Sequence, residues 1–245
     1  MNKQPTVYGK LCSLFYDATK AYASEREVSF YTSFIEHNPG RVLEAMSGSG
    51  RLQIPLLQRG YTVDGVDNSP IMLARCRERC AALNLAPQLY EQSLEGLALP
   101  FKYHTVTIAV GSFQLIVDRD KALLALQNLR VHMYNGANLL LDIFVPDVTL
   151  EERSTRIARI DQHTIVRLTK RYVFNQQEKI ADAFCLYELI VNGKVQEQEN
   201  ELLQVVWYTD GELIQLLEQA GFTVIKIYNE LFHSAGPSRI VHAQV

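Results

Sequence analysis

The chain has 245 residues, of which 47% are hydrophobic and 21% charged, a globular composition that excludes a disordered or low-complexity chain. Its net charge of −3 lacks the basic excess usual in proteins that hold duplex nucleic acid through phosphate contacts, so we expect no nucleic-acid partner. The polar start, and the lack of any apolar run near the roughly 18 residues that span a bilayer, predict neither a signal peptide nor a membrane partner.

Residues 40–145 alternate short apolar runs with helical patterns. The turn after the first run leads into a helix, and Ser69-Pro70 is typical of a helix start, with serine as N-cap and proline at the first position. Asp118 is the N-cap expected for a later helix that ends at Asn135-Gly136. The predicted strands are 41–45, 61–66, 88–91, 105–110 and 139–145, and the predicted helices are 51–59, one from 70, and 118–134.

Residues 151–206 follow a different pattern. Two long runs rich in Val, Ile, Tyr and Phe occupy 164–174 and 180–191, and no helical pattern separates them. Asn192-Gly193 is a strong two-residue hairpin signal, and a third strand runs from it to about residue 203. This segment is therefore expected to be an inserted antiparallel sheet of about three strands. It would serve as a substrate cover or as the interface of a homodimer.

The end of the chain returns to the first pattern. Thr209-Asp210-Gly211-Glu212 is a capping box that opens a helix, and two apolar runs at 222–228 and 239–245 read as a paired hairpin. Apolar strands separated by helices form a parallel sheet covered on both faces. We therefore predict an α/β fold with a doubly wound, mostly parallel, seven-stranded sheet, Rossmann-like, with the antiparallel insertion. Its predicted parts are 1–150 with N-terminal helices, 151–206 and 207–245.

Ligands in such folds bind outside the carboxyl ends of the strands, and three of these ends carry polar residues. The first strand ends in Glu44 and a turn with Gly48 and Gly50. Glycines there let the backbone approach a ligand, and the helix that follows offers free N–H groups. Asp67 ends the second strand, where a carboxylate can accept hydrogen bonds from a ribose diol. Ser93 follows the third strand, beside the expected place of a nucleobase.

Other nucleotide ligands fit less well. A nicotinamide-binding turn would need a third glycine where Gln53 stands, and the Gly-Lys-Ser/Thr of a phosphate-binding loop does not occur. Acidic strand ends suit a cationic or polyhydroxylated ligand better than a polyphosphate. The sequence thus favours a nucleoside ligand that is cationic or polyhydroxylated, and it disfavours a nicotinamide oxidoreductase.

At these residues the sequence resembles the class I S-adenosylmethionine-dependent methyltransferases. Their first strand ends in an acid and a Gly-x-Gly-x-Gly turn. Here Glu44 is followed by Met46 in place of the first glycine, and then by Gly48 and Gly50. We expect the turn to form if the Met46 position needs no positive φ. The stretch 67–73, an acid followed by a small cap and a Met-Leu pair, is similar to the family's second motif, and the resemblance covers most of the chain outside the insertion.

The resemblance implies S-adenosylmethionine as cofactor and gives roles to single residues. Asp67 would hold the ribose, Asn68 and Met72 would border the adenine, and Ser93 would read the adenine edge where the family often has an aspartate. Glu44 and the turn backbone would face the methionyl part. The implied cofactor-binding set is Glu44, Ala45, Met46, Ser47, Gly48, Asp67, Asn68, Met72, Gln92, Ser93, Leu94, Gly111 and Ser112.

Aromatic residues near the N-terminus suggest a lid, as in members of the family. Tyr16 and Tyr22 are the lid candidates, although both could simply pack on the first helix. Phe113, after the fourth strand, is the candidate substrate contact. His233, between the last two strands, could act as a base or be an ordinary surface histidine.

The implied reaction is transfer of a methyl group to a small-molecule acceptor. The cofactor's sulfonium already activates the methyl group, so positioning can supply much of the catalysis, about 7–11 kcal/mol, and no catalytic residue can be named. The alternative is a non-catalytic module that binds S-adenosylmethionine or its product S-adenosylhomocysteine. The four cysteines are sparse, with Cys76 and Cys80 read as packing residues rather than as a metal site; they predict a reducing, cytoplasmic location.

Overall fold

The computed structural model describes residues 8–146, 153–229 and 238–245. The chain divides into two compact units, each built from two stretches of sequence. One unit comprises Met1–Ala21 and Asp147–Val205, and the other comprises Tyr22–Pro146 and Val206–Val245. Each is described below by itself.

The larger unit is built on a seven-stranded mixed sheet. The strand order is β10-β11-β5-β4-β1-β2-β3; β11 runs antiparallel to both of its neighbours, and the other described pairings are parallel. This confirms the predicted fold class, including the C-terminal hairpin. The strands are β1 (Val42–Ala45), β2 (Val63–Asp67), β3 (Leu89–Glu91), β4 (Tyr103–Ile108), β5 (Met133–Phe144), β10 (Thr223–Tyr228) and β11 (Ser238–Gln244).

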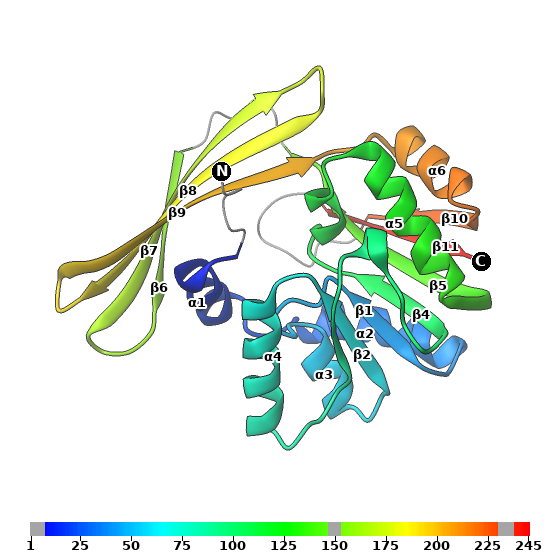
Figure 1. The fold of residues 1–245 in the computed structure, drawn as a ribbon, viewed down its shortest axis with the longest axis horizontal. Coiled ribbons are helices and arrows are strands. Elements are labelled where there is room, and N and C mark those ends of the chain that lie inside the picture. The colour runs from blue at the N-terminus through cyan, green and yellow to red at the C-terminus, as the bar shows by residue number, and fades with distance from the viewer. Residues whose placement is uncertain (1–7, 147–152, 230–237) are drawn as a thin grey trace. The chain divides into compact units, whose positions relative to one another are not determined.

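Helices cover both faces of this sheet (Figure 1). Buried side chains of α5 and α6 pack on one face, and those of α2 and α3 pack on the other, where α4 adds Cys76 and Cys80 against α3. Both cysteines are buried and free. The helices are α2 (Glu25–His37), α3 (Gln53–Gln58), α4 (Pro70–Ala82), α5 (Arg119–Val131) and α6 (Asp210–Gln219), with short 3-10 turns η1 (Leu94–Gly96) and η2 (Ser112–Leu115).

The helix starts follow the capping residues read from the sequence. The Ser69 side chain accepts from the Met72 N–H, and Pro70 occupies the first helical position of α4. Asp118 accepts from two backbone N–H groups at the start of α5. Thr209 and Glu212 form the predicted reciprocal capping box of α6.

One boundary differs from the prediction. Helix α5 ends at Val131, and β5 already begins at Met133. Gly136, predicted to end the helix, lies inside the strand with φ +76°. The register of β5 with β4 shifts there. Gly136 therefore lies at an irregularity within β5, and the strand continues past it.

The smaller unit contains a four-stranded antiparallel sheet of order β6-β7-β8-β9. The sequence indicated three of these strands, and Asn192-Gly193 makes the predicted hairpin with both residues at positive φ. Strand β6 was not predicted, because Arg153-Ser-Thr-Arg-Ile-Ala-Arg159 is largely polar and exposed. The bounds are β6 (Arg153–Arg159), β7 (Thr164–Asn175), β8 (Ile180–Val191) and β9 (Lys194–Val206).

Helix α1 (Lys10–Thr19) packs on one face of this antiparallel sheet (Figure 1). Leu11 and Phe15 are buried there against strand residues such as Val166. The Glu199 carboxylate on β9 accepts from the first N–H groups of the helix, those of Leu11 and Cys12, at 3.0 and 3.1 Å. A carboxylate at this end is favoured by the unsatisfied N–H groups and by the helix dipole.

Within the described stretches of chain, no helix has the length and hydrophobicity to span a bilayer.

Candidate active site

The carboxyl ends of β1, β2 and β3 meet at one edge of the seven-stranded sheet. In the register, Ala45 lies beside Val66, and Asp67 lies beside Glu91. The turn after β1, the acid that ends β2 and the loop after β3 are therefore neighbours. This is the edge at which an open α/β sheet binds its ligand.

Asp67 has its carboxylate oriented by backbone N–H groups. One oxygen accepts from the Gly48 N–H at 2.8 Å, and the other accepts from the Ser69 N–H at 2.8 Å. Burial raises the pKa of Asp67, and these backbone hydrogen bonds oppose the rise. A carboxylate has about four acceptor positions, so the group keeps capacity for further donors.

The turn after β1 takes the left-handed conformation at three positions. Met46 has φ +57°, Gly48 has +54° and Gly50 has +84°. The condition set for this turn, that Met46 need no positive φ, is not met: the turn forms with methionine in the left-handed conformation, which it adopts without the freedom of glycine. Such residues are uncommon and concentrate at functional sites. Gly50 is required for a second reason, because a Cβ there would lie 2.8 Å from the Cys76 sulfur.

Glu44 lies at the base of this turn, almost fully buried at 3% exposure. Burial raises the pKa of Glu44 to about 8, although the Arg51 charge and a hydrogen bond from the Gln53 backbone act against the rise. The group is therefore protonated at neutral pH. Its Oε2 has no hydrogen-bond partner, and neither has the buried Ser47 hydroxyl in the same turn. Two buried polar atoms at this turn are thus left without a hydrogen-bond partner.

Sequence reasoning missed several residues beneath this edge. Tyr31 of α2 is fully buried, and its hydroxyl has no hydrogen-bond partner. Burial and then the Asp142, Glu27 and Glu44 charges raise its pKa, while Arg51 opposes them. The sequence analysis chose Tyr16 and Tyr22 from the N-terminal segment as site candidates and gave Tyr31 no role.

Three charged neighbours of Tyr31 connect elements around the site. Arg51 and Glu27 form a buried ion pair between the turn and α2. The Asp142 carboxylate on β5 accepts from the Val110 N–H at 2.9 Å. Val110 follows β4 and has φ +59°, which is a rare conformation for a β-branched residue. The buried Asp142 carboxylate therefore holds the strained backbone at Val110, directly after β4.

The residues expected to border an adenine lie after β2 and β3. Asn68 and Ser93 are exposed, whereas Met72 and Leu94 are buried. The methyl carbon of Met72 lies 3.1 Å from where a Cβ on Gly48 would stand, so this side chain packs against the turn. The Gln92 side chain is occupied, because it bonds the backbone N–H and carbonyl of Ala98.

The loop after β4 is mostly packed inward. Gly111 has φ +68°, and the Ser112 hydroxyl donates to the Ala109 carbonyl at 2.8 Å. Phe113, the candidate substrate contact, is fully buried and stacks on Tyr208 with ring centroids 6.1 Å apart. In this structure its surroundings are those of a core residue.

The two lid candidates fall into different units. Tyr16 lies on α1 in the smaller unit, with its ring edge-on to Tyr8. Tyr22 begins the larger unit and is 49% exposed. The Arg79 guanidinium lies over the Tyr22 ring at 4.7 Å and also donates to the Ser49 carbonyl at 2.8 Å. His233 lies outside the described residues.

Comparison with known proteins agrees with this geometry. Residues 42–136 match a family model described as a methyltransferase domain. The chain is 21% identical over 212 residues to a predicted methyltransferase of Geobacillus sp. (strain WCH70), which covers 86% of this chain and 84% of the relative. It is 28% identical over 132 residues to a phosphatidylethanolamine N-methyltransferase of Cereibacter sphaeroides, covering 54% and 64% of the two chains.

Solved structures share the whole architecture. An S-adenosylmethionine-dependent methyltransferase from Clostridium acetobutylicum superposes with a TM-score of 0.78 at 14% identity, covering 97% of this chain and 98% of that one. The sugar N-methyltransferase KedS8 from Streptoalloteichus superposes with a TM-score of 0.79 at 15% identity, covering 100% and 98%. At such identities these likenesses establish the fold.

The family model covers the turn and the strand ends described above, and curated relatives named as methyltransferases match the sequence. Residues 42–136 therefore match a methyltransferase domain, and the fold of the chain is that of solved S-adenosylmethionine-dependent methyltransferases.

Proposed function

We propose that the carboxyl edge of β1, β2 and β3 binds S-adenosylmethionine and presents its methyl group to a small-molecule acceptor with a nitrogen nucleophile. The observation that carries the proposal is the pairing of two acids. Asp67 is held by two backbone N–H groups, and beside the same turn lies Glu44 with a buried oxygen that has no partner. One suits a ribose diol, and the other suits a cationic amino acid group.

The residues fit this cofactor part by part. The turn 46–50 lets the backbone approach closely, because three of its residues have positive φ. Asn68, Met72, Ser93 and Leu94 would border the adenine, as the family resemblance implies. Gly111 and Ser112 would lie beside the methionyl end. When bound, the cofactor supplies a methyl group on a sulfonium. The chain itself orients both partners and excludes water, which lowers the barrier through positioning.

The acceptor class rests on what the related proteins are named for. KedS8 is a sugar N-methyltransferase, CalS10 from Micromonospora is an amino pentose methyltransferase, and the Cereibacter relative methylates the nitrogen of phosphatidylethanolamine. All three names specify an amine. We therefore infer an amine acceptor, with amino sugars as the first compounds to test.

The test is binding and turnover measured with the same protein. Calorimetric titration with S-adenosylmethionine should give saturable binding, and Asp67→Asn should weaken it by about 100-fold, since a charge-assisted contact contributes about 1.5–3 kcal/mol. Glu78→Gln, an exposed acid on α4, is the matched control and should bind like the parent. Equal affinity of the Asp67 variant and the parent would refute the proposed site.

Turnover separates the enzyme from a binding module. Release of S-adenosylhomocysteine in the presence of a panel of amino sugars should exceed the rate without acceptor. Binding without such release for amino sugars and for simple amines would contradict the acceptor class.

The parts outside the cofactor site receive roles in the same proposal. The core of 1–150 and 207–245 would hold the cofactor, and 151–206 would cover the substrate or join two copies of the chain. Exposed Ile157 and Val195, at 60% and 46%, support self-association, because they lie on the edge strands β6 and β9, where unpaired backbone groups can extend a sheet. Light scattering should then show a dimer that Ile157→Glu converts to a monomer.

Four buried, free cysteines support a cytoplasmic location.

A further inference from the structure

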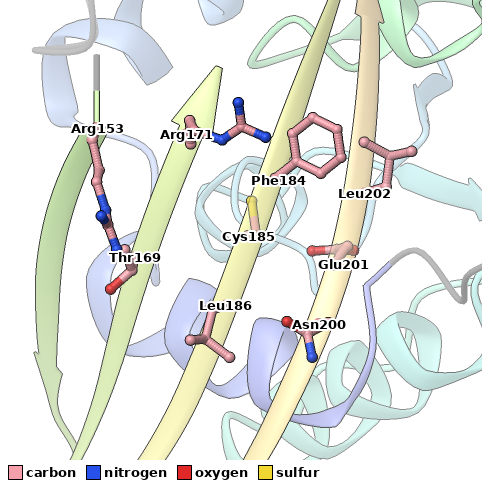
Figure 2. Close-up of a pocket in the computed structure, with 9 residues that line it drawn as sticks. All are labelled: Arg153, Thr169, Arg171, Phe184, Cys185, Leu186, Asn200, Glu201 and Leu202. Carbon is pink, nitrogen blue, oxygen red and sulfur yellow. The ribbon is translucent and has the colours of Figure 1, made fainter. Parts of the chain in front are cut away.

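The antiparallel sheet has a hollow on the face that does not contact α1. Its volume is about 510 Å³, within the range of small-molecule sites. Side chains alternate along each strand, and in Figure 2 those of Arg171, Phe184, Leu186 and Leu202 belong to neighbouring strands of one face. Cys185, between Phe184 and Leu186 on β8, also lines the hollow. Its side chain belongs to the cluster that packs with α1 on the other face.

Two arginines line this hollow, and Figure 2 shows the Arg153 guanidinium beside Thr169 and the Arg171 guanidinium turned toward Phe184. Arg153 of β6 and Arg171 of β7 are directly opposite in the antiparallel register, an arrangement that destabilises a sheet when the charges are alike. Within the described residues neither forms an ion pair with a carboxylate, whereas Arg167 on the same face is paired with Glu188 at 2.7 Å. In the part of the chain that the structure describes, these two guanidinium groups therefore have no carboxylate within ion-pair distance.

The acid among the lining residues does not pair with these arginines. Glu201 lines the hollow, but its carboxylate accepts from the Tyr8 N–H on the side of α1. The apolar part of the lining comes from an aromatic ring and two leucines. The Arg171 guanidinium lies over the Phe184 ring at 4.8 Å, which orients its donors, and Phe184 is 42% exposed.

From these features we propose a binding site for a small organic anion in this hollow. Arg171, with Arg153 on the same lining, would hold a carboxylate or phosphate, because guanidinium donors match both in geometry. The apolar body of the ligand would lie on Phe184, Leu186 and Leu202, and the Asn200 amide would offer a further polar contact. This site is separate from the cofactor edge and is built entirely from β6–β9.

The test uses the full chain saturated with S-adenosylmethionine and three probes of one shape. These probes are 1-naphthoate, 1-naphthyl phosphate and the neutral 1-naphthylmethanol, and their binding is measured by titration calorimetry. One or both anions should bind at least tenfold more tightly than the neutral probe, and the ratio of the two anions identifies a carboxylate or a phosphate site. Binding should weaken as salt is raised.

Variants locate the binding. Arg171→Gln and Arg153→Gln should each weaken the preferred anion about tenfold or more, since one charge-assisted contact is lost. Arg156 is an exposed arginine of β6, three residues after Arg153, so its side chain lies on the opposite face of the strand. Arg156→Gln should therefore leave the affinity unchanged. Asp67→Asn should also leave it unchanged, which separates failure here from failure of the proposed cofactor site.

Three results would overturn the proposal: equal binding of the neutral probe, an anion affinity unchanged in both arginine variants, or a dimer that buries the hollow and is dissociated by Arg171→Gln. The arginine variants should fold, because removing one of two opposed like charges relieves repulsion. Thermal unfolding without ligand should therefore show an unchanged or slightly higher Tm.

Discussion

At the scale of single residues, the buried acid at the base of the cofactor turn has the largest consequence. Glu44 is inside the protein, and its pKa is raised from an ordinary 4.5 to about 8. The folded chain therefore keeps a proton that the unfolded chain loses above about pH 4.5. Stability from this group is fully present below that pH and is lost as the pH rises to about 8.

Glu44→Gln should remove this pH dependence. Glutamine is neutral and of the same shape, so the variant should match the parent near pH 4, below the ordinary pKa of the carboxyl. It should be more stable than the parent at pH 8, by on the order of a few kcal/mol. Urea unfolding of both proteins at several pH values measures the difference. Parallel curves for the two proteins would contradict a raised pKa of Glu44.

The same proton should respond to the cofactor. A cationic amino acid group near Glu44 favours the ionised carboxylate, so binding of S-adenosylmethionine should release a proton between about pH 6 and 8. Calorimetric titration in two buffers of different ionisation enthalpy measures that release. The Glu44→Gln variant, which has no proton to lose there, should show none, and an equal release by both proteins would refute the coupling.

At the scale of elements, the turn between β1 and α3 combines a backbone demand with close packing. Gly50 has φ +84°, and a Cβ on it would lie 2.8 Å from the Cys76 sulfur of α4. Gly60 has nearly the same φ, +85°, and a Cβ there would meet nothing within 4 Å. Both glycines therefore have a positive φ, but only Gly50 lacks room for a Cβ.

This pair gives a matched prediction. Gly60→Ala should cost about 1 kcal/mol, the penalty of a left-handed non-glycine residue. Gly50→Ala should cost about 2–4 kcal/mol, because steric overpacking adds to that penalty. Denaturant unfolding measures both. Equal losses would show that α4 gives way to the added methyl group.

The contact of Arg79 fastens the same turn to the start of the larger unit. Its guanidinium stacks on Tyr22 and donates to the Ser49 carbonyl. Arg79→Gln should raise the KM for S-adenosylmethionine several-fold at nearly constant kcat, because the turn loses a support while the reacting groups stay in place. Arg77→Gln, an exposed neighbour on α4, is the control, and a fall in kcat alone would contradict this role.

At the scale of the molecule, the two units should respond separately to core mutations. Phe15 is buried in the smaller unit at 8% exposure and Phe222 in the larger at 2%. Each change to alanine should cost about 3–5 kcal/mol. Hydrogen exchange followed by mass spectrometry should show faster exchange mainly in the unit that carries the change. Faster exchange throughout the chain in both variants would mean that the units unfold as one.

Much of the larger unit could be predicted because its signals are local. Capping residues such as Ser69 and Thr209 act within one turn, and apolar runs mark strands buried on both faces. The left-handed Met46 could not be predicted, because the surrounding turn imposes a conformation that methionine disfavours. Tyr31 could not be predicted as a site neighbour, because its spacing from Val28 and Ile35 on α2 is that of an ordinary core residue. The opposition of Arg153 and Arg171 depends on strand register, which the sequence does not specify for the polar β6.

The hydrogen bonds between Glu199 and the first N–H groups of α1 join two segments that the ribosome makes at very different times. The Leu11 N–H and its acceptor are 188 residues apart in sequence. At about 5–20 residues per second, the helix emerges roughly 10–40 s before its partner strand. Until then its apolar face has no sheet to cover it, and the larger unit also awaits its last strands. A nascent chain of this protein therefore leaves this apolar helix face uncovered for most of its translation.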